Sequence, residues 1–327
     1  MRFKLMVPFW ALSSVTSICA LDASVESLQE EGRRLQRGGH YSEAREEFTA
    51  ALRDAEKFDG DRMQVAGILD DLGTVDEELG QYTDAERSYK RSLILLEKAF
   101  GPEHALTATV VSHLGALYAQ TGRPAKAKPL LDRALSIRLR SLGPDDIATA
   151  ELLNQNGIVY FFLGKHSEAE SFFRQALAIF EKQLGSGDVQ VATVLTNLAR
   201  LAAISGRNEE ALSDAERSKN ILERLPNPPP PVLVGSFSVL GALYARSDRV
   251  NEAESYLKRA VSISENSFGP ESPRTAHVLQ DYAFVLRRLK RQHEANHLEK
   301  RAALILSKNA QANSYGYIVD ISQTRSR

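Results

Sequence analysis

Apolar and small residues recur along this chain at helical spacing, and the pattern repeats at a nearly constant interval. One alanine marks each copy, and the set is Ala44, Ala85, Ala127, Ala169, Ala211, Ala253 and Ala295. The first interval is 41 residues, and the next five are 42 residues each. Chance does not produce this regularity, so the chain is expected to consist of seven copies of one structural unit.

Each copy has the pattern of two amphipathic helices. Twelve residues before each alanine lies a small residue, and this set is Gly32, Gly73, Gly115, Gly157, Ala199, Gly241 and Ala283. Four residues after the alanine, most copies have a large apolar residue: Phe48, Tyr89, Leu131, Phe173 or Leu257. Residues three and four apart share one face of a helix, so the large side chain is expected to fill a gap beside a small residue of a neighbouring helix.

The first helix of each copy carries a recognisable motif. The segments "HLGALYAQTG" (113–122) and "VLGALYARSD" (239–248) resemble the first helix of a tetratricopeptide repeat, with Leu-Gly-x-x-Tyr followed by Ala-x-x-x-large. The usual unit has about 34 residues, and each unit here carries about eight more. The extra residues end in joints such as "FGPEHALTATV" (100–110), which resemble the kinesin light chain variety of the repeat.

The resemblance covers roughly residues 25–308 and implies an all-α fold. The expected architecture is a right-handed α-solenoid superhelix of about seven helix pairs, assigned to residues 21–308, in which each unit touches its neighbours. One joint, "LPNPPPPVLVG" (225–235), contains four consecutive prolines. It is either a polyproline ligand for another domain or a stiffer version of the same joint, and the second interpretation is favoured.

The last residues, 309–327, lose the repeat pattern and are expected to form a disordered tail. A strand formed against a partner is the alternative, because apolar residues alternate at Tyr315, Tyr317, Val319 and Ile321.

Residues 1–20 read as a secretory signal peptide. Arg2 and Lys4 give a positive start, an apolar stretch follows, and Ala20 offers a small residue at the cleavage position. The alternatives are an uncleaved anchor and a lipoprotein signal, although a lipoprotein signal needs a small residue before its cysteine and Ile18 is not one. Cleavage would remove Cys19, the only cysteine of the chain, so the mature protein would have no thiol nucleophile and no cysteine metal ligand. We therefore expect an exported protein, periplasmic or secreted, whose mature form does not span a membrane.

Composition and motifs exclude several classes of function. With 43% hydrophobic and 25% charged residues and a net charge of -1, the chain gives no reason to expect nucleic acid as a partner. It contains neither a glycine-rich phosphate loop nor a G-x-S-x-G nucleophile motif. We expect no enzyme activity, no cofactor and no small-molecule substrate.

One enzyme-like motif is present, His293-Glu294-x-x-His297, which fits the H-E-x-x-H pattern of zinc proteases. However, Ala295 is the marker alanine of the seventh copy, and Glu-Ala recurs at this place in other copies, for example at 168–169. No histidine follows His297 to complete a ligand set. A zinc-dependent hydrolase therefore remains a weak alternative, with adventitious metal binding a second one, and a plain helix start is favoured.

In tetratricopeptide repeats the first helix of each unit lines a concave groove, so its outward residues are the expected peptide-binding site. The candidates are Asp70, Asp71, Glu77, Glu78, His113, Asn154, Gln155, Phe161, Phe162, Asn197, Arg200, Arg246, Arg287 and Arg288. Along the superhelix they change from mostly acidic, through polar and aromatic, to mostly basic. This order suits one orientation of an extended peptide, with an acidic group or a carboxylate near Arg287 and Arg288. A chance gradient on a solvated surface is the alternative.

The favoured function is a non-catalytic scaffold that holds a peptide or protein partner of unknown identity. An accessory factor in envelope assembly or secretion differs from this only in what it holds. Sequence does not name the partner, because fold and function are decoupled in repeat scaffolds.

Overall fold

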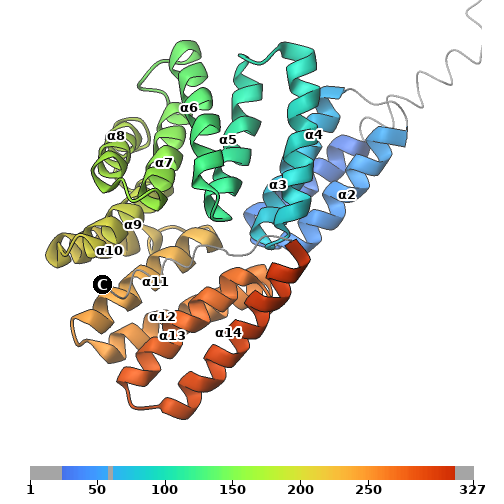
Figure 1. Ribbon diagram of the computed structural model, residues 1–327. Coiled ribbons are helices and arrows are strands. Elements are labelled where there is room, and N and C mark those ends of the chain that lie inside the picture. Colours follow the sequence, from blue (N-terminus) through green and yellow to red (C-terminus); the bar gives the residue numbers. More distant parts are fainter. Residues whose placement is uncertain (1–23, 58–61, 314–327) are drawn as a thin grey trace, which may run out of the picture.

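The computed structural model describes residues 24–57 and 62–313 (Figure 1). The predicted signal peptide lies outside these residues, and so does the predicted tail from residue 314 onward. The regular structure of the described part is helical, with a first helix over 24–37 and thirteen more. These are α2 (Tyr41–Lys57), α3 (Arg62–Glu78), α4 (Tyr82–Phe100), α5 (Ala105–Gln120), α6 (Pro124–Ser141), α7 (Ile147–Phe162), α8 (His166–Leu184), α9 (Val189–Ile204), α10 (Asn208–Leu222), α11 (Pro230–Arg246), α12 (Val250–Phe268), α13 (Pro273–Arg288) and α14 (Gln292–Asn313).

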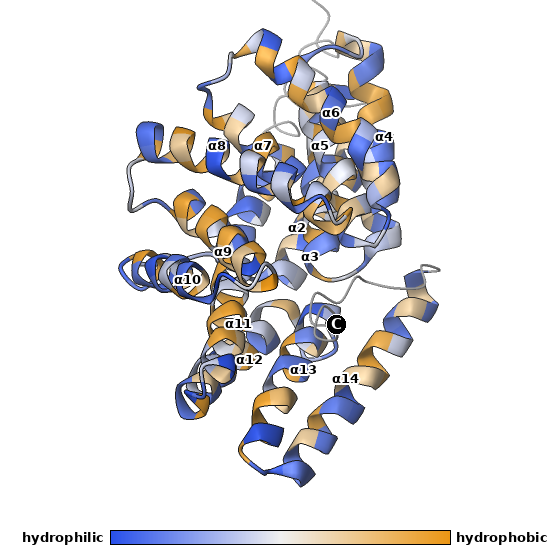
Figure 2. Cartoon of the chain, turned by 60° about the vertical axis from the view of Figure 1, so that its left-hand side comes forward, coloured by the Kyte–Doolittle hydropathy of each residue, from blue (hydrophilic) through white to orange (hydrophobic). Residues whose placement is uncertain are grey.

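The helices form seven antiparallel pairs that follow one another around a superhelix, which confirms the expected α-solenoid. The first helices of neighbouring units pack against one another, as α7 does against α5 and α9. We call these first helices (24–37, α3, α5, α7, α9, α11 and α13) the inner helices, because they line the concave side. The second helix of each unit packs against the next inner helix and faces outward, and Figure 2 shows polar and apolar residues alternating along such helices.

In five of the seven pairs, a large side chain of the outer helix lies against a glycine of the inner helix. A Cβ atom on Gly73 would lie 2.5 Å from Cε1 of Tyr89, and one on Gly157 would lie 2.5 Å from Cε1 of Phe173. In the fifth unit both positions are small, Ala199 and Ala215, and both are buried. Close contact between the two helices is thus reached either by a glycine facing a large side chain or, in the fifth unit, by two small residues.

The joints between units end one helix and start the next by local chemistry. Gly101 follows α4 with a φ of 86°, a backbone conformation that side-chain-bearing residues rarely adopt. Four inner helices begin with a side chain that accepts a hydrogen bond from a backbone N–H two residues on: His104, Asp146, Asp188 and Ser272. In the proline-rich joint, Pro230 and Pro231 form the first turn of α11, which agrees with the interpretation of this segment as a stiffer joint between two units.

The superhelix completes one turn, so its two ends meet. The ring of Tyr41 on α2 stacks on Phe268 of α12, with ring centroids 5.5 Å apart. Arg274 of α13 forms an ion pair with Glu78 of α3, with a nitrogen–oxygen distance of 3.0 Å. We call this meeting of the first two units with the last two the closure. The repeat pattern does not predict it, because the pattern concerns contacts between neighbouring units only.

The end of α14 completes the closure. Asn313 donates from Nδ2 to the carbonyl of Gly80 at 3.1 Å and accepts at Oδ1 from the backbone N–H of Thr83 at 3.0 Å. Asn309 also donates to the Gly80 carbonyl, at 2.9 Å. The helix therefore continues to Asn313, past the expected end of the superhelix at residue 308, because these asparagines gain partners in the turn between α3 and α4. Within the part of the chain that the structure describes, no helix has both the length and the apolar character needed to cross a membrane.

The glycine contacts predict a size limit at the inner helices. Replacing Gly157 with alanine should lower the free energy of unfolding by about 1–2 kcal/mol, because the clash with Phe173 costs more than the helix propensity of alanine returns. Urea denaturation would measure the change. Gly187→Ala is the control, since a Cβ there has no neighbour within 4 Å. Equal stability of the two variants would contradict this packing constraint.

The closure predicts that a residue at the end of α14 affects both the stability and the compactness of the fold. Asn313→Ala should cost about 1–2 kcal/mol of stability by removing the two side-chain hydrogen bonds to Gly80 and Thr83, and should increase the radius of gyration measured by small-angle X-ray scattering. Asn296→Ala on the same helix is the control, because among the described residues its side chain bonds only to Gln292 of that helix. A radius of gyration that matches the control would show that these bonds do not hold the ends together.

Candidate functional site

The inner helices are joined by a row of polar side chains at equivalent positions of successive units. Gln29 donates to Asp71 at 2.7 Å, His113 Nδ1 lies 2.8 Å from Asp70 Oδ1, and Asn197 donates to Asn154 at 3.0 Å. We call these three pairs the inner ladder. Five of the six residues were predicted to face the groove. The structure places them on the concave side but shows that they also bind one another.

Acidic residues gather where the inner ladder meets the closure. Glu77 and Glu78 end α3, Tyr89 donates to Glu77 at 3.2 Å, and Arg274 pairs with Glu78. Burial, and then the Glu78 carboxylate, raise the pKa of Glu77 to about 7. Burial also raises the pKa of Glu78, against the lowering effect of Arg274. Sequence reasoning missed Arg274, because its partner lies in a unit five copies earlier in the chain.

His113 is a second positive group of this region, besides Arg274. Burial alone would lower its pKa, but the adjoining Asp70 carboxylate, followed by Glu77 and Glu151, raises it to about 9. His113 is therefore a cation at neutral pH, and it partly neutralises the acidic inner face of α3 and α7.

The middle of the concave side has an aromatic hollow. It is lined by residues of α7, α8 and α9: Ile158, Phe161, Phe162, Phe173, Asn197 and Arg200. The rings of Phe161 and Phe162 meet edge to face, with centroids 5.7 Å apart. Four of these residues were predicted site residues, and the structure brings them together on two neighbouring inner helices.

The three arginines that were predicted to form the basic end of the groove bind within the chain itself. Arg246 donates to the carbonyl of Ala203 at 3.2 Å, Arg287 pairs with Glu299 of α14, and Arg288 pairs with Asp248 at 3.0 Å. These three arginines are exposed. They bind neighbouring parts of the same chain near the turns that end the inner helices. The remaining predicted residue, Gln155, lies at the centre of the concave side and is half-buried on α7.

The zinc-protease motif lies at the start of α14, with His293 and His297 exposed. Glu294, the residue that would serve as a base, bonds to Arg291, with one nitrogen–oxygen distance of 2.6 Å. Among residues 24–57 and 62–313, no group of three histidine, cysteine or acidic side chains is arranged to hold a metal ion.

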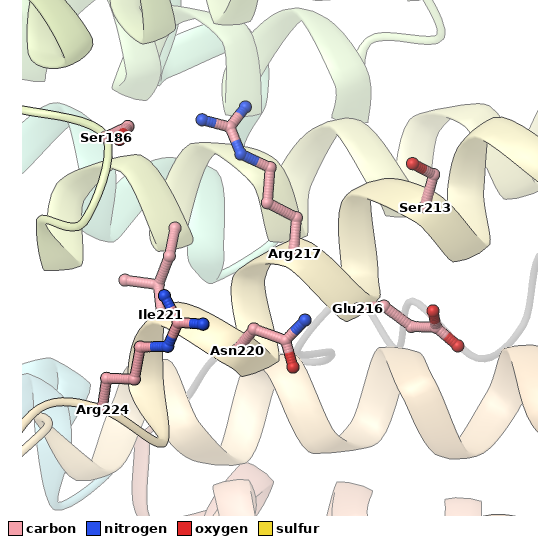
Figure 3. A pocket seen from close by; sticks show the side chains of 7 residues that line it. All are labelled: Ser186, Ser213, Glu216, Arg217, Asn220, Ile221 and Arg224. Atoms are coloured by element: carbon pink, nitrogen blue, oxygen red, sulfur yellow. The ribbon is translucent and has the colours of Figure 1, made fainter.

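A larger, open hollow lies on the outer side, between α10 and the turn before α9 (Figure 3). Its lining is polar, and it consists of Ser186, Ser213, Glu216, Arg217, Asn220, Ile221 and Arg224. The repeat pattern does not distinguish these residues from other positions of the outer helices and the joints. Two of them already bind within the chain: Glu216 accepts from the Tyr244 hydroxyl at 3.0 Å, and Arg217 pairs with Glu181. We therefore take the concave side as the candidate site.

Comparison with known families identifies the repeat. The tetratricopeptide repeat model matches residues 64–140, 110–182, 146–224 and 236–306. This confirms the resemblance inferred from the Leu-Gly-x-x-Tyr motifs. No curated protein matches the sequence.

Several solved structures are similar to the chain. The Rap conjugation gene regulator of plasmid pLS20, in complex with the Phr* peptide, has a TM-score of 0.71 at 13% identity, covering 100% of this chain and 82% of that chain. A Rap protein complexed with Competence and Sporulation Factor has a TM-score of 0.65 at 16% identity, covering 88% of this chain and 76% of that one. A protein from Podosopora anserina, described as having TPR-like repeats of kinesin light chain type, has a TM-score of 0.47 at 23% identity, covering 64% and 98%. For the two Rap proteins, at these identities, the similarity shows the fold alone.

The pairing of His113 predicts how stability depends on pH. Because its pKa is raised from 6.5 to about 9, His113 stabilises the fold fully below pH 6.5, and this contribution is lost as the pH rises through about 9. Partial exposure limits the loss to roughly 1–2 kcal/mol. Denaturation at both ends of this interval should therefore show a smaller decrease for His113→Gln than for the wild type.

The exposed His293→Gln is the matched control and should behave as the wild type does. A decrease of the same size in His113→Gln and in the wild type would mean that the ion pair with Asp70 does not stabilise the fold.

Proposed function

The chain belongs to the tetratricopeptide repeat family, and we propose that it is a non-catalytic scaffold that holds an extended peptide, or an extended segment of a protein, along its concave side. Folds of this kind typically bind proteins or peptides. The finer statement, that the ligand is extended and lies against the inner helices, is the proposal.

The observation that carries the proposal is the composition of the concave side. The aromatic hollow has half-buried phenylalanines that are only partly covered by the chain itself, Phe161 and Phe162. Partly exposed aromatic rings beside polar groups are typical of binding surfaces, because a partner can bury them and still satisfy the polar groups.

The inner ladder supports a peptide backbone as the ligand. In the pair Asn154–Asn197 one amide N–H bonds to one amide oxygen. Each asparagine side chain has one oxygen and two N–H donors, so the pair has capacity left for a second partner. A peptide backbone presents alternating N–H and C=O groups that match this capacity.

Two of the similar structures are complexes, one with the Phr* peptide and one with Competence and Sporulation Factor. They support a ligand held by a superhelix of this kind, although the low identity carries no ligand over to this chain. We also propose, from residues 1–20, that the protein acts after export, where an accessory role in envelope assembly or secretion would be a special case. No observation favours the zinc-hydrolase alternative.

Cross-linking tests the proposal. A photoreactive phenylalanine analogue in place of Phe162 should cross-link to a single short segment of a partner in an extract of the source cells, because Phe162 faces the concave side. The same analogue at Ile94, which is 66% exposed on the outer helix α4, is the control. Cross-links only from position 94 would overturn the proposal.

Once a partner is known, Phe162→Ala should weaken its binding by about tenfold or more, which is the usual effect of truncating a buried aromatic anchor. Titration calorimetry would measure this. Ile94→Ala should leave the affinity unchanged.

A further inference from the structure

Large apolar side chains that remain exposed gather at one edge of the superhelix. Each unit is an antiparallel helix pair, so the joints between units lie at the same edge, where a second helix ends and the next inner helix begins. Nine large apolar residues of the described chain are exposed, and six of them lie in or beside the three successive joints that follow α4, α6 and α8. We call these six the joint stripe: Phe100, Leu106, Leu139, Leu142, Ile147 and Leu184.

The repeat places three residues of the joint stripe at equivalent positions. Phe100, Leu142 and Leu184 each precede the glycine of a joint and are 42 residues apart, and between 38% and 47% of each remains exposed. Phe268 has the same position in the sixth unit but is only 3% exposed, because the Tyr41 ring stacks on it in the closure. A joint residue of this chain can therefore bind an apolar group from a distant unit, and the joint stripe leaves three such residues open to solvent.

At the centre of the joint stripe, an apolar residue replaces part of a recurring ion pair. Arg133 of α6 pairs with Glu97 of α4 at 2.8 Å, and the same pair recurs between the later second helices. Leu139 and Gln175 stand at the equivalent positions of α6 and α8, and Gln175 bonds instead to Ser171 of its own helix. The repeat pattern therefore does not account for the exposed Leu139.

The charges beside the joint stripe are already paired. Arg140 pairs with Glu103 and Lys182 with Asp145, and each pair links two neighbouring joints. A second copy of the same surface therefore meets no excess of like charge from these residues, and such pairs can be exchanged across a twofold axis. An anionic membrane surface would instead be attracted by an excess of basic residues, which these balanced pairs do not supply.

The size of the joint stripe suits a dimer. Six side chains that are each about 40% exposed leave apolar surface on the order of 400 Å². A standard protein interface buries about 800 Å² on each partner, of which somewhat more than half is apolar. Two joint stripes that face one another therefore supply most of the apolar area that a specific dimer needs.

We propose that the joint stripe is the interface of a homodimer, in which a second copy of this chain packs its own joint stripe against the first about a twofold axis. The axis passes beside Leu142, the middle of the three equivalent joint residues. Leu142 then meets its counterpart, and Phe100 meets Leu184 of the partner subunit. The joint edge is separate from the concave side, so the inference does not depend on the proposed peptide-binding function.

Sedimentation equilibrium of the purified full chain over micromolar concentrations tests the dimer. The wild type should change from the mass of a monomer to that of a dimer as the concentration rises. Leu142→Glu should raise the dissociation constant of the dimer by about tenfold or more, because it puts a charge into the apolar centre of the interface. Leu304→Glu is the matched control, since Leu304 is 55% exposed on α14, outside the three joints. Circular dichroism should show the same helical content in all three proteins.

Disulfide cross-linking tests the direction of packing, in chains that carry Cys19→Ser to remove the natural cysteine. Leu142→Cys should form a disulfide between two identical copies under mild oxidation. Phe100→Cys and Leu184→Cys should cross-link when the two chains are mixed, and neither should cross-link with itself.

A monomeric mass at every concentration would overturn the proposal, and so would a dimer that Leu142→Glu and Leu304→Glu weaken equally. Assemblies that grow beyond a dimer would also overturn it, because they indicate a head-to-tail contact and not a twofold one. Disulfides between two copies of Phe100→Cys would contradict the proposed pairing of Phe100 with Leu184. None of these outcomes bears on the cross-linking from Phe162, which tests the concave side.

Discussion

The close approach of the two helices in each unit is the contact on which the rest of the structure depends. In five of the seven units a glycine on the inner helix lies under a large side chain of the outer helix, as at Gly73 and Tyr89 or at Gly157 and Phe173. These contacts fix the distance and the crossing of the pair. Because nearly the same geometry recurs every 42 residues, small rotations between units add up in one direction, and the inner helices line a common concave side.

That accumulated rotation has a consequence that no single unit shows. After seven pairs, the last units reach the first ones, and Tyr41, Phe268, Glu78, Arg274 and Asn313 take part in the closure. A linear repeat array depends on contacts between neighbours alone, and its end units are free to fray. Here the end units are tied to each other, so the curvature of the concave side is held from both ends.

The electrostatics of the concave side follow from the same geometry. Closure brings Arg274 to Glu78 at the acidic end of α3. Contact between neighbouring units places His113 of α5 against Asp70 of α3, and against the effect of burial the carboxylates of Asp70, Glu77 and Glu151 raise the pKa of His113 and make it a cation at neutral pH. Most charged groups on this side thereby acquire partners within the chain. Arg200 is the exception among the arginines discussed, since it lines the aromatic hollow, where burial lowers its pKa and the Asp281 carboxylate on α13 only partly offsets this.

Sequence by itself determined the unit, the number of copies, the helical class and the side of each unit that faces the concave surface. These follow from periodicity, because residues at fixed spacing on a helix share a face whatever the distant contacts are. Periodicity therefore also predicts that the concave side brings together Phe161, Phe162, Asn197 and Arg200. The partners of Arg287 and Arg288, the role of Arg274, the helical state of 309–313 and the closure were decided by tertiary structure alone. They depend on the summed rotation between units. A difference of a few degrees per unit decides whether the two ends of the superhelix meet, and no local residue pattern encodes so small a difference.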